Sequence, residues 1–125
     1  MRNAEKGDMK EKEYLHALEE WIHINQDCSA VDGWTCIGLP IFYSDGDGVS
    51  IYVKENEEGY TLADDGETLS VHCVGQEAMV IKFLVDYGYE INNNEIMQRV
   101  RKENLGLSVW NMAQTIVMAS YVKNV

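Results

Sequence analysis

The clearest structural pattern in the chain is "WTCIGLPIFYSDGDGVSIYVKENEEGYTLAD", residues 34–64. An apolar run is followed by the turn signal "DGDG", by "VSIYVKE", in which apolar and polar residues alternate, and by a second turn at "NEEG". Alternation with a period of two is typical of a strand with one buried face, and glycine-rich polar segments between such runs predict hairpins. The stretch therefore predicts a three-stranded antiparallel meander. Pro40 cannot donate a hydrogen bond to a neighbouring strand, so we expect its strand to lie at an edge or to bulge there.

A segment with helical periodicity precedes the meander. In residues 9–27 apolar side chains recur at intervals of three and four, while charged residues occupy the other faces. Asp8 is a suitable N-cap. We expect a helix whose apolar stripe packs on the sheet, after a frayed start at residues 1–8. The stripe consists of Tyr14, Leu15, Leu18, Trp21 and Ile22, with Ile24 as a further candidate.

Helical periodicity returns after the meander. Residues 67–74 are typical of the start of a helix, and Gln76–Asp86 predicts a helix that ends at Gly88 as its C′ glycine. The segment "LSVWNMAQTIVMASYVKNV", with Ser108 as N-cap, predicts a C-terminal helix. Its residues expected to face the core are Val109, Met112, Ala113, Ile116, Val117 and Ala119.

The segment "YEINNNEIMQRVRKEN", residues 89–104, has two interpretations. A hairpin that turns at residues 92–94 is favoured over a helix that begins near Asn94. With the hairpin, the predicted fold class is α+β: an antiparallel β-meander plus a second hairpin, packed against N-terminal, central and C-terminal helices. The length suits a single domain that spans residues 1–125.

The charge balance is strongly acidic. The 125 residues contain 21 acidic and 10 basic side chains, a net charge of −11. Affinity for nucleic acid depends on Lys and Arg that displace counterions from phosphates, so direct nucleic-acid binding is not expected. The basic cluster Arg99, Arg101 and Lys102 is too small to change this. An acidic surface instead favours solubility, a basic protein partner or imitation of a polyanion.

Cysteine usage and hydropathy indicate where in the cell the protein is expected. Cys28, Cys36 and Cys73 form no CxxC pair, so a structural zinc site is not expected and reduced thiols are the simplest interpretation. The start of the chain has no secretory pattern, and no apolar run approaches the ~20 residues that span a bilayer. We expect a cytoplasmic protein without a membrane contact. No cofactor motif is present, and no cofactor is expected.

Two adjacent aspartates in "LADDGETLSV", residues 62–71, are the first candidates for chemistry. As a pair, Asp64 and Asp65 would bind a divalent ion or act as general acid and base. However, consecutive side chains of an extended chain point to opposite faces, and the further carboxylates and the lysine or histidine of a metal nuclease are not identifiable. The favoured interpretation is structural: an aspartate caps the following helix, and Gly66 allows a tight corner.

Other metal and nucleophile patterns are weaker. The "DGDG" turn lacks the later ligands of a calcium loop. His72 and Cys73 are neighbours on an expected helix and point about 100° apart, so a thiol–imidazole pair is not expected. The histidines His16, His23 and His72 have no ligand spacing. No metal site is predicted.

Acidic residues concentrate in the meander. Between Asp45 and Glu67 there are eight acids and one base, Lys54. Alternate turns of a meander lie at the same end of a sheet, so "DGDG" and "DDG" should form one acidic cluster and "NEEG" a second, one strand length away. The competing interpretation is that turns are polar without any binding role. The candidates for contact with a partner are Asp45, Asp47, Glu55, Glu57, Glu58, Asp64 and Asp65.

The central span also resembles a known family. The runs "LPIFYSDGDGVSIYV" and "YTLADDGETL", within residues 39–69, are similar to the pattern of domain of unknown function 1828. Ile41 between Pro40 and Phe42, and Ala63 in place of the usual threonine, depart from that pattern. The resemblance implies a gene of a phage or another bacterial mobile element, and it implies no catalytic residue.

Three hypotheses for function follow from the charge and the resemblance. The first is a non-enzymatic protein-binding module that inhibits a host nucleic-acid-targeting defence effector, in the manner of an anti-CRISPR protein, through the acidic residues above. The second is a divalent-metal-dependent nuclease or nucleotide enzyme that uses Asp64 and Asp65. The third is an antitoxin-like regulatory module, for which a homodimer is possible.

Overall fold

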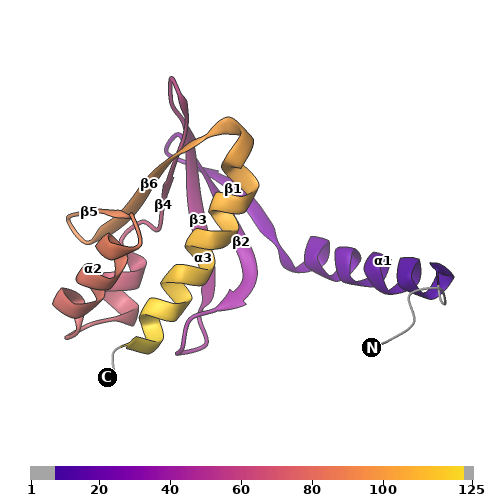
Figure 1. Cartoon of the computed structure of the whole chain (residues 1–125), viewed down its shortest axis with the longest axis horizontal. Helices are drawn as coiled ribbons and strands as arrows, with labels where there is room; N and C mark the ends of the chain where they lie inside the picture. Colours follow the sequence, from indigo (N-terminus) through magenta and orange to yellow (C-terminus); the bar gives the residue numbers. More distant parts are fainter. Residues whose placement is uncertain (1–7, 123–125) are drawn as a thin grey trace.

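A computed structural model describes residues 8–122, with side chains from residue 10 onward (Figure 1). A six-stranded antiparallel sheet carries two helices on one face, and a third helix projects from the sheet. The elements are α1 (Asp8–Asn25), β1 (Asp27–Val31), β2 (Trp34–Phe42), β3 (Gly48–Glu55), β4 (Gly59–Ala63), the short helical turn η1 (Thr68–His72), α2 (Glu77–Asp86), β5 (Glu90–Asn92), β6 (Glu95–Arg101), the 3₁₀ turn η2 (Lys102–Asn104) and α3 (Leu105–Val122). The predicted α+β class is confirmed.

The sheet has the strand order β1-β2-β3-β4-β6-β5. The predicted meander is its centre, β2 to β4. β1 was not predicted, because its segment "DCSAV" is short, wholly exposed and without apolar alternation. Tertiary pairing makes it a strand: β1 pairs with β2 through a turn at Asp32 and Gly33, which both have positive φ.

Pro40 lies at an irregularity of β2. The register with β3 shifts between Leu39 and Phe42. The pairing of β2 with β1 covers Trp34–Gly38 and does not reach Pro40, so β2 lies at the edge of the sheet at this point, and its pairing with β3 is irregular there too. The expectation of an edge or a bulge at Pro40 is confirmed. A bulge leaves a residue out of the hydrogen-bond ladder, which suits a residue that has no N–H.

The second hairpin is confirmed over the alternative helix. β5 pairs with β6, and the turn residues Asn93 and Asn94 have φ of 51° and 65°. Two consecutive residues with positive φ define the turn that best matches the twist of a hairpin, and asparagine tolerates this conformation.

The core lies between the sheet and the helices α2 and α3. Val49, Ile51 and Val53 of β3 are buried on this side, as their alternation predicts. The expected inward residues of α3 are also buried, with Val117 only partly so. The predicted N-cap is wrong: Ser108 lies inside α3, because the turn η2 leads the chain into the helix three residues earlier.

The segment between β4 and α2 is less helical than expected. Only the five residues of η1 form a helical turn in place of the helix expected over residues 67–74, and Gly75, with φ of 86°, separates it from α2. The end of α2 is as predicted. Gly88 has φ of 91° and donates its N–H to the Val85 carbonyl (3.0 Å), as a C′ glycine does.

The N-terminal helix is confirmed, but its expected packing is wrong. α1 projects from the sheet (Figure 1), and its contact with the sheet is with β2. The stripe predicted to be buried is exposed, from 38% at Ile22 to 68% at Tyr14. The side chain of Asp8 and residues 1–7, for which capping and fraying were predicted, lie outside the described part of the chain. Between residues 8 and 122 no helix combines the length and apolar character needed to cross a bilayer.

Candidate functional site

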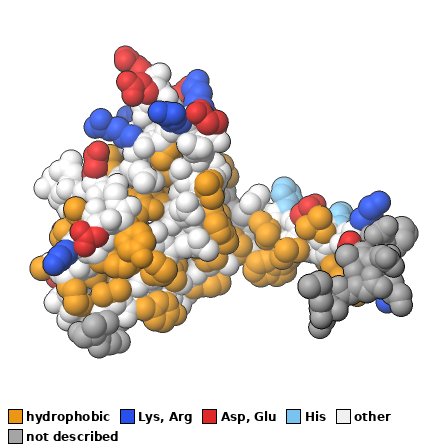
Figure 2. Space-filling view, viewed as in Figure 1, with side chains coloured by type: hydrophobic (Ala, Val, Ile, Leu, Met, Phe, Trp, Pro, Cys, Tyr) orange, Lys and Arg blue, Asp and Glu red, His pale blue; other side chains and the backbone are white. Residues whose placement is uncertain are grey.

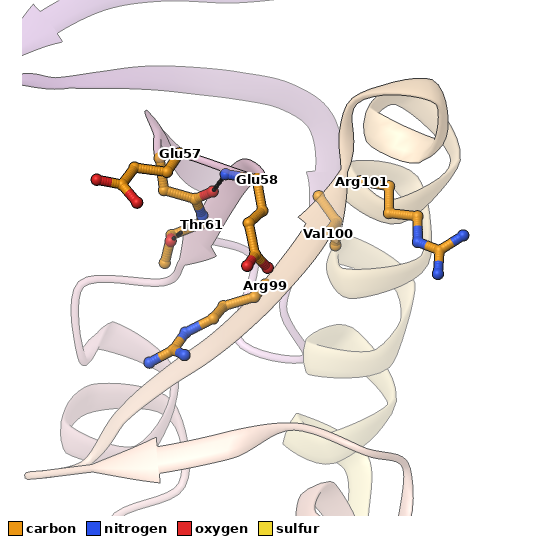
Figure 3. Close-up of a pocket in the computed structure, with 7 residues that line it drawn as sticks. Glu57, Glu58, Thr61, Arg99, Val100 and Arg101 are labelled. Carbon is orange, nitrogen blue, oxygen red and sulfur yellow. Dashed lines mark hydrogen bonds between the residues drawn. The ribbon is translucent and has the colours of Figure 1, made fainter.

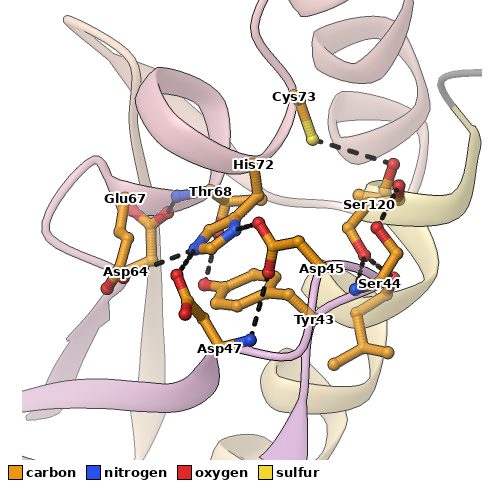
Figure 4. Close-up of polar contacts among 12 residues, drawn as sticks. Tyr43, Ser44, Asp45, Asp47, Asp64, Glu67, Thr68, His72, Cys73 and Ser120 are labelled. Atoms are coloured by element: carbon orange, nitrogen blue, oxygen red, sulfur yellow. Dashed lines mark hydrogen bonds and ion pairs between the residues drawn. The ribbon is translucent and has the colours of Figure 1, made fainter.

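A buried histidine, His72, lies where the turn between β2 and β3 meets η1 (Figure 4). Its ring stacks on Tyr43, with centroids 3.7 Å apart and planes 13° from parallel. The Tyr43 hydroxyl shares a hydrogen bond of 2.9 Å with Thr68 Oγ1, and burial raises the pKa of Tyr43. The stacking against a neutral, hydrogen-bonded phenol holds the imidazole in one orientation.

Three carboxylates surround this ring (Figure 4). Asp45 Oδ2 lies 2.5 Å from Nδ1. Near the other nitrogen, Nε2, Glu67 Oε1 lies at 3.4 Å and Asp47 Oδ2 at 3.8 Å. Ionised carboxylates only accept hydrogen bonds, so both ring nitrogens can donate together only when the imidazole carries two protons. Through these contacts the ring links Asp45 and Asp47, in the turn between β2 and β3, to the segment that follows β4.

The "DGDG" turn orients its two aspartates through local hydrogen bonds. Asp45 Oδ1 accepts the N–H of Asp47 (3.1 Å), and the Tyr43 N–H donates to the Asp47 carbonyl (2.8 Å). Gly46 has φ of 94°, a conformation that favours glycine. A side-chain bond to the backbone two residues on is the local pattern that makes aspartate common in turns. The sequence of the turn therefore directs both carboxylates toward η1.

Asp64 has the structural role that was favoured for it. It is fully buried. Its Oδ1 accepts the N–H groups of Gly66 (2.9 Å) and Ile96 (2.9 Å), and its Oδ2 accepts the N–H of Thr68 (3.0 Å). A carboxylate with three N–H donors is well satisfied in the interior. This burial disfavours the predicted contact between Asp64 and a partner, because the side chain has no surface to offer.

Asp65 points away from Asp64. It is exposed and lines a cavity of about 210 Å³ with Trp34, Tyr52 and Glu95. Tyr52 alternates with the core-facing residues of β3, so this cavity lies on the sheet face opposite the helices. Burial and the nearby Asp64 and Asp65 raise the pKa of Glu95, and burial raises the pKa of Tyr52 to about 12. The adjacent aspartates do not converge, and the geometry gives no support to a catalytic or metal-binding pair.

The acids of the "NEEG" turn lie at the opposite end of the sheet. Glu57 and Glu58 line a hollow of about 510 Å³ with Arg99 and Arg101 of β6 (Figure 3). Acidic and basic side chains mix at this end (Figure 2). Next to it, Lys102 Nζ lies 3.9 Å from Glu55 Oε1. The basic residues of β6 therefore offset part of the negative charge that the sequence places in this turn.

The structure brings together only some of the predicted residues. Asp45 and Asp47 meet Glu67 around His72, which confirms that "DGDG" and "DDG" lie at one end of the sheet. Sequence reasoning did not identify His72 as a member of the cluster, because it lies 27 residues from Asp45. The expected proximity of the "DGDG" and "DDG" turns is the signal in the sequence that points to this contact. Cys73, its neighbour, points toward the Ala119 carbonyl of α3 (Sγ···O 3.8 Å), as the angular argument expects.

Comparison with known proteins supplies one match. A protein-family profile described as domain of unknown function DUF1828 matches residues 39–118, more than half of the 125 residues. The matched range begins within β2 and ends within α3, so α1 and β1 lie outside it. No curated protein and no solved structure matches the chain.

Proposed function

We propose, for a chain that belongs to the family domain of unknown function DUF1828, that it is a non-enzymatic protein-binding module of a phage or mobile element. Its partner is the basic surface of a protein in the bacterial cytoplasm, and the best candidate is a nucleic-acid-targeting defence effector that it inhibits. Because the family has no assigned activity, the support comes from the surface of this chain.

The observation that carries this proposal is the uncovered stripe of α1. Leu15, Leu18 and Trp21 are 57%, 54% and 51% exposed, on a helix that projects from the domain. In Figure 2 hydrophobic side chains gather along one side of this helix. Burial of one such side chain is worth about 1.5–3 kcal/mol, so a protein that covers the stripe gains substantial affinity. A helix laid with its apolar face into a groove is a common mode of recognition.

The charge of the chain favours a basic partner. The net charge of −11 steers a basic protein toward the surface and gives an association rate that falls with salt. All the predicted contact residues except Asp64 are exposed, and those that remain the main candidates are Asp47, Glu57, Glu58 and Asp65. A smaller part in partner contact is expected for Asp45, whose carboxylate contacts His72, and for Glu55, which lies near Lys102.

The two rival hypotheses differ in their support. A metal-dependent nuclease built on Asp64 and Asp65 is disfavoured by the divergence of these side chains. An antitoxin-like homodimer is compatible with α1, since a second copy is another way to cover the stripe. The molar mass in solution, measured by light scattering, separates a dimer from a monomer that awaits a different partner.

The test begins with affinity capture from the native host and continues with the purified partner. We expect an association rate that falls steeply between 50 and 300 mM salt, and loss of nucleic-acid binding or cleavage by the partner when the chain is added. Leu18→Asp should weaken binding at least tenfold. Its matched control is Glu19→Ala, on another face of α1, which should change affinity little.

Three outcomes would contradict the proposal. Binding that is insensitive to both salt and Leu18→Asp would show that neither the acidic residues nor the stripe of α1 contacts the partner. A partner that still binds and cuts nucleic acid in the complex would show that the chain does not inhibit it. Cleavage of DNA or RNA by the purified chain itself would show an enzyme.

A further inference from the structure

The Nε2 atom of His72 lies in an unusual environment. The side chain of His72 is fully buried, yet its closest carboxylate on this side, Glu67 Oε1, is 3.4 Å away. Normal N–H···O hydrogen bonds are about 2.7–3.2 Å long. A buried imidazole nitrogen is thus left with long contacts to two carboxylates, Glu67 and Asp47, and with no shorter side-chain hydrogen bond.

These separations suit an ion better than a direct hydrogen bond. Two ligands that each lie about 2.1 Å from a tetrahedrally coordinated ion are about 3.4 Å apart. Asp45, Asp47 and His72 each offer a ligand atom within 4.8 Å of the other two. On the Nε2 side of the ring the distances are 3.4 Å to Glu67 Oε1, which is an additional ligand on this side, and 3.8 Å to Asp47 Oδ2. The two carboxylates are 39% and 63% exposed, so an ion could enter from solvent and keep water in its remaining positions.

The opposite side of the ring has the partner that a metal-bound histidine requires. Asp45 Oδ2 lies 2.5 Å from Nδ1, and its Oδ1 is held by the N–H of Asp47. Histidines that bind metal through one nitrogen almost always donate the other N–H to a carboxylate or carbonyl, which fixes the tautomer and the ring orientation. The stacking of Tyr43 holds the ring further. Asp45 and Asp47 therefore have different roles, because they face different nitrogens.

We propose that His72 Nε2, Asp47 and Glu67 bind one divalent transition-metal ion, with Asp45 as the positioning residue that holds the ring. Imidazole with carboxylates suits Zn²⁺ and Mn²⁺. The ion ties the turn between β2 and β3 to the segment that leads into η1. This site is separate from the stripe of α1 but includes Asp47, one of the candidate contact residues. Metal binding by the chain alone therefore tests the site apart from the proposed function.

Titration calorimetry of the whole, chelator-treated chain with ZnCl₂ and then with MnCl₂ tests the proposal. We expect saturable binding of one ion, tighter for Zn²⁺ than for Mn²⁺, and a rise in melting temperature with the ion present. Asp47→Asn and Glu67→Gln should each weaken binding at least tenfold. Asp45→Asn should weaken it by about 10–100-fold through the ring alone.

Two controls distinguish this site from adventitious binding. Asp65→Asn removes a neighbouring acid on the other sheet face and should leave affinity unchanged. His16→Gln combined with His23→Gln removes both histidines of α1 and should also leave it unchanged. The proposal is overturned by no saturable binding, by binding that survives Asp47→Asn and Glu67→Gln, or by binding that disappears with the histidines of α1. The two carboxylate variants are exposed and conservative, so the test does not depend on whether His72→Gln folds.

Discussion

Helices α1 and α3 are both 18 residues long and both carry an apolar stripe, but only one of them is part of the core. In α3, Met112 and Ile116 are fully buried. In α1, Leu18 and Trp21 are about half exposed. An amphipathic pattern therefore shows that a helix has a face to cover, and leaves open what covers it.

The difference comes from how each helix is joined to the sheet. α3 follows β6, which lies inside the sheet between β4 and β5, and the turn η2 returns the chain across the sheet face. α1 precedes β1, an edge strand, which leaves it beyond the border of the sheet (Figure 1). α3 also has the small residues Ala113 and Ala119 on its buried side, which allow close packing.

The largest expected effect contrasts one residue from each helix. Ile116→Ala should lower the free energy of unfolding by about 2–5 kcal/mol, because it leaves a cavity under α3. Leu18→Ala should lower it by about 0.5 kcal/mol or less, as for other exposed positions. Urea denaturation followed by circular dichroism measures both. Equal losses would mean that α1 is packed in solution, within the chain or against a second copy.

The next effect concerns the corner that supports η1, on which α3 packs. Asp64→Asn replaces one of two accepting oxygens by an NH₂ group, which cannot accept from an N–H. We expect a loss of about 2–4 kcal/mol in the free energy of unfolding, because a buried donor is left unsatisfied. Asp65→Asn is the matched control and should cost about 0.5 kcal/mol or less. Similar losses for both variants would argue against the separate roles of the two aspartates.

A smaller effect is expected where the end of α3 is fastened to the turn after β2. Ser120 Oγ accepts the N–H of Ser44 (3.0 Å) and donates to the Val117 carbonyl (2.6 Å). Ser120→Ala should lower the unfolding free energy by about 1 kcal/mol. Ser108→Ala, inside the same helix, should lower the unfolding free energy less. Thermal melts of the two variants measure the difference. A loss of about 1 kcal/mol at Ser108 would instead indicate the N-cap that the sequence suggested.

The smallest effect is expected on the sheet face opposite α2 and α3. The raised pKa of Glu95 means that folding favours its protonated form, so this contribution to stability is present below the pKa of the unfolded chain and is lost as pH rises through the folded pKa. Glu95→Gln resembles the protonated form and should melt higher than the wild type at pH 7. The gain should vanish below about pH 4, where the carboxyl is protonated in both states. A gain that does not depend on pH would show a different cause.

Much of the fold follows from local signals. The alternation in β3, the glycine-rich turns, the Asn-Asn turn of the second hairpin and the spacing of Met112 and Ile116 each predict a structure that is present. These signals are local because strand and helix periodicities, and the conformations of turns, depend on residues within a few positions. For the same reason the acidic turns at one end of the sheet could be predicted.

The candidate site could be predicted only in part. Asp45 and Asp47 were selected for their charge, but their contact with His72 joins residues far apart in sequence. The opposite orientations of Asp64 and Asp65 agree with the expected alternation of an extended chain, while the burial of Asp64 depends on the Ile96 N–H of a distant strand. Glu67 was counted as an acid and not recognised as a neighbour of the imidazole.

The meander, the second hairpin, the core stripe of α3 and the acidic charge can all be predicted from the residues, because periodicity, turn chemistry and composition are properties of short segments or of the whole chain. Three features depend on long-range packing instead: β1 is a strand, α1 stays uncovered and His72 meets three carboxylates. Each of these depends on which surfaces the sheet brings together or leaves apart, and burial and hydrogen-bond partners across such distances are set by packing.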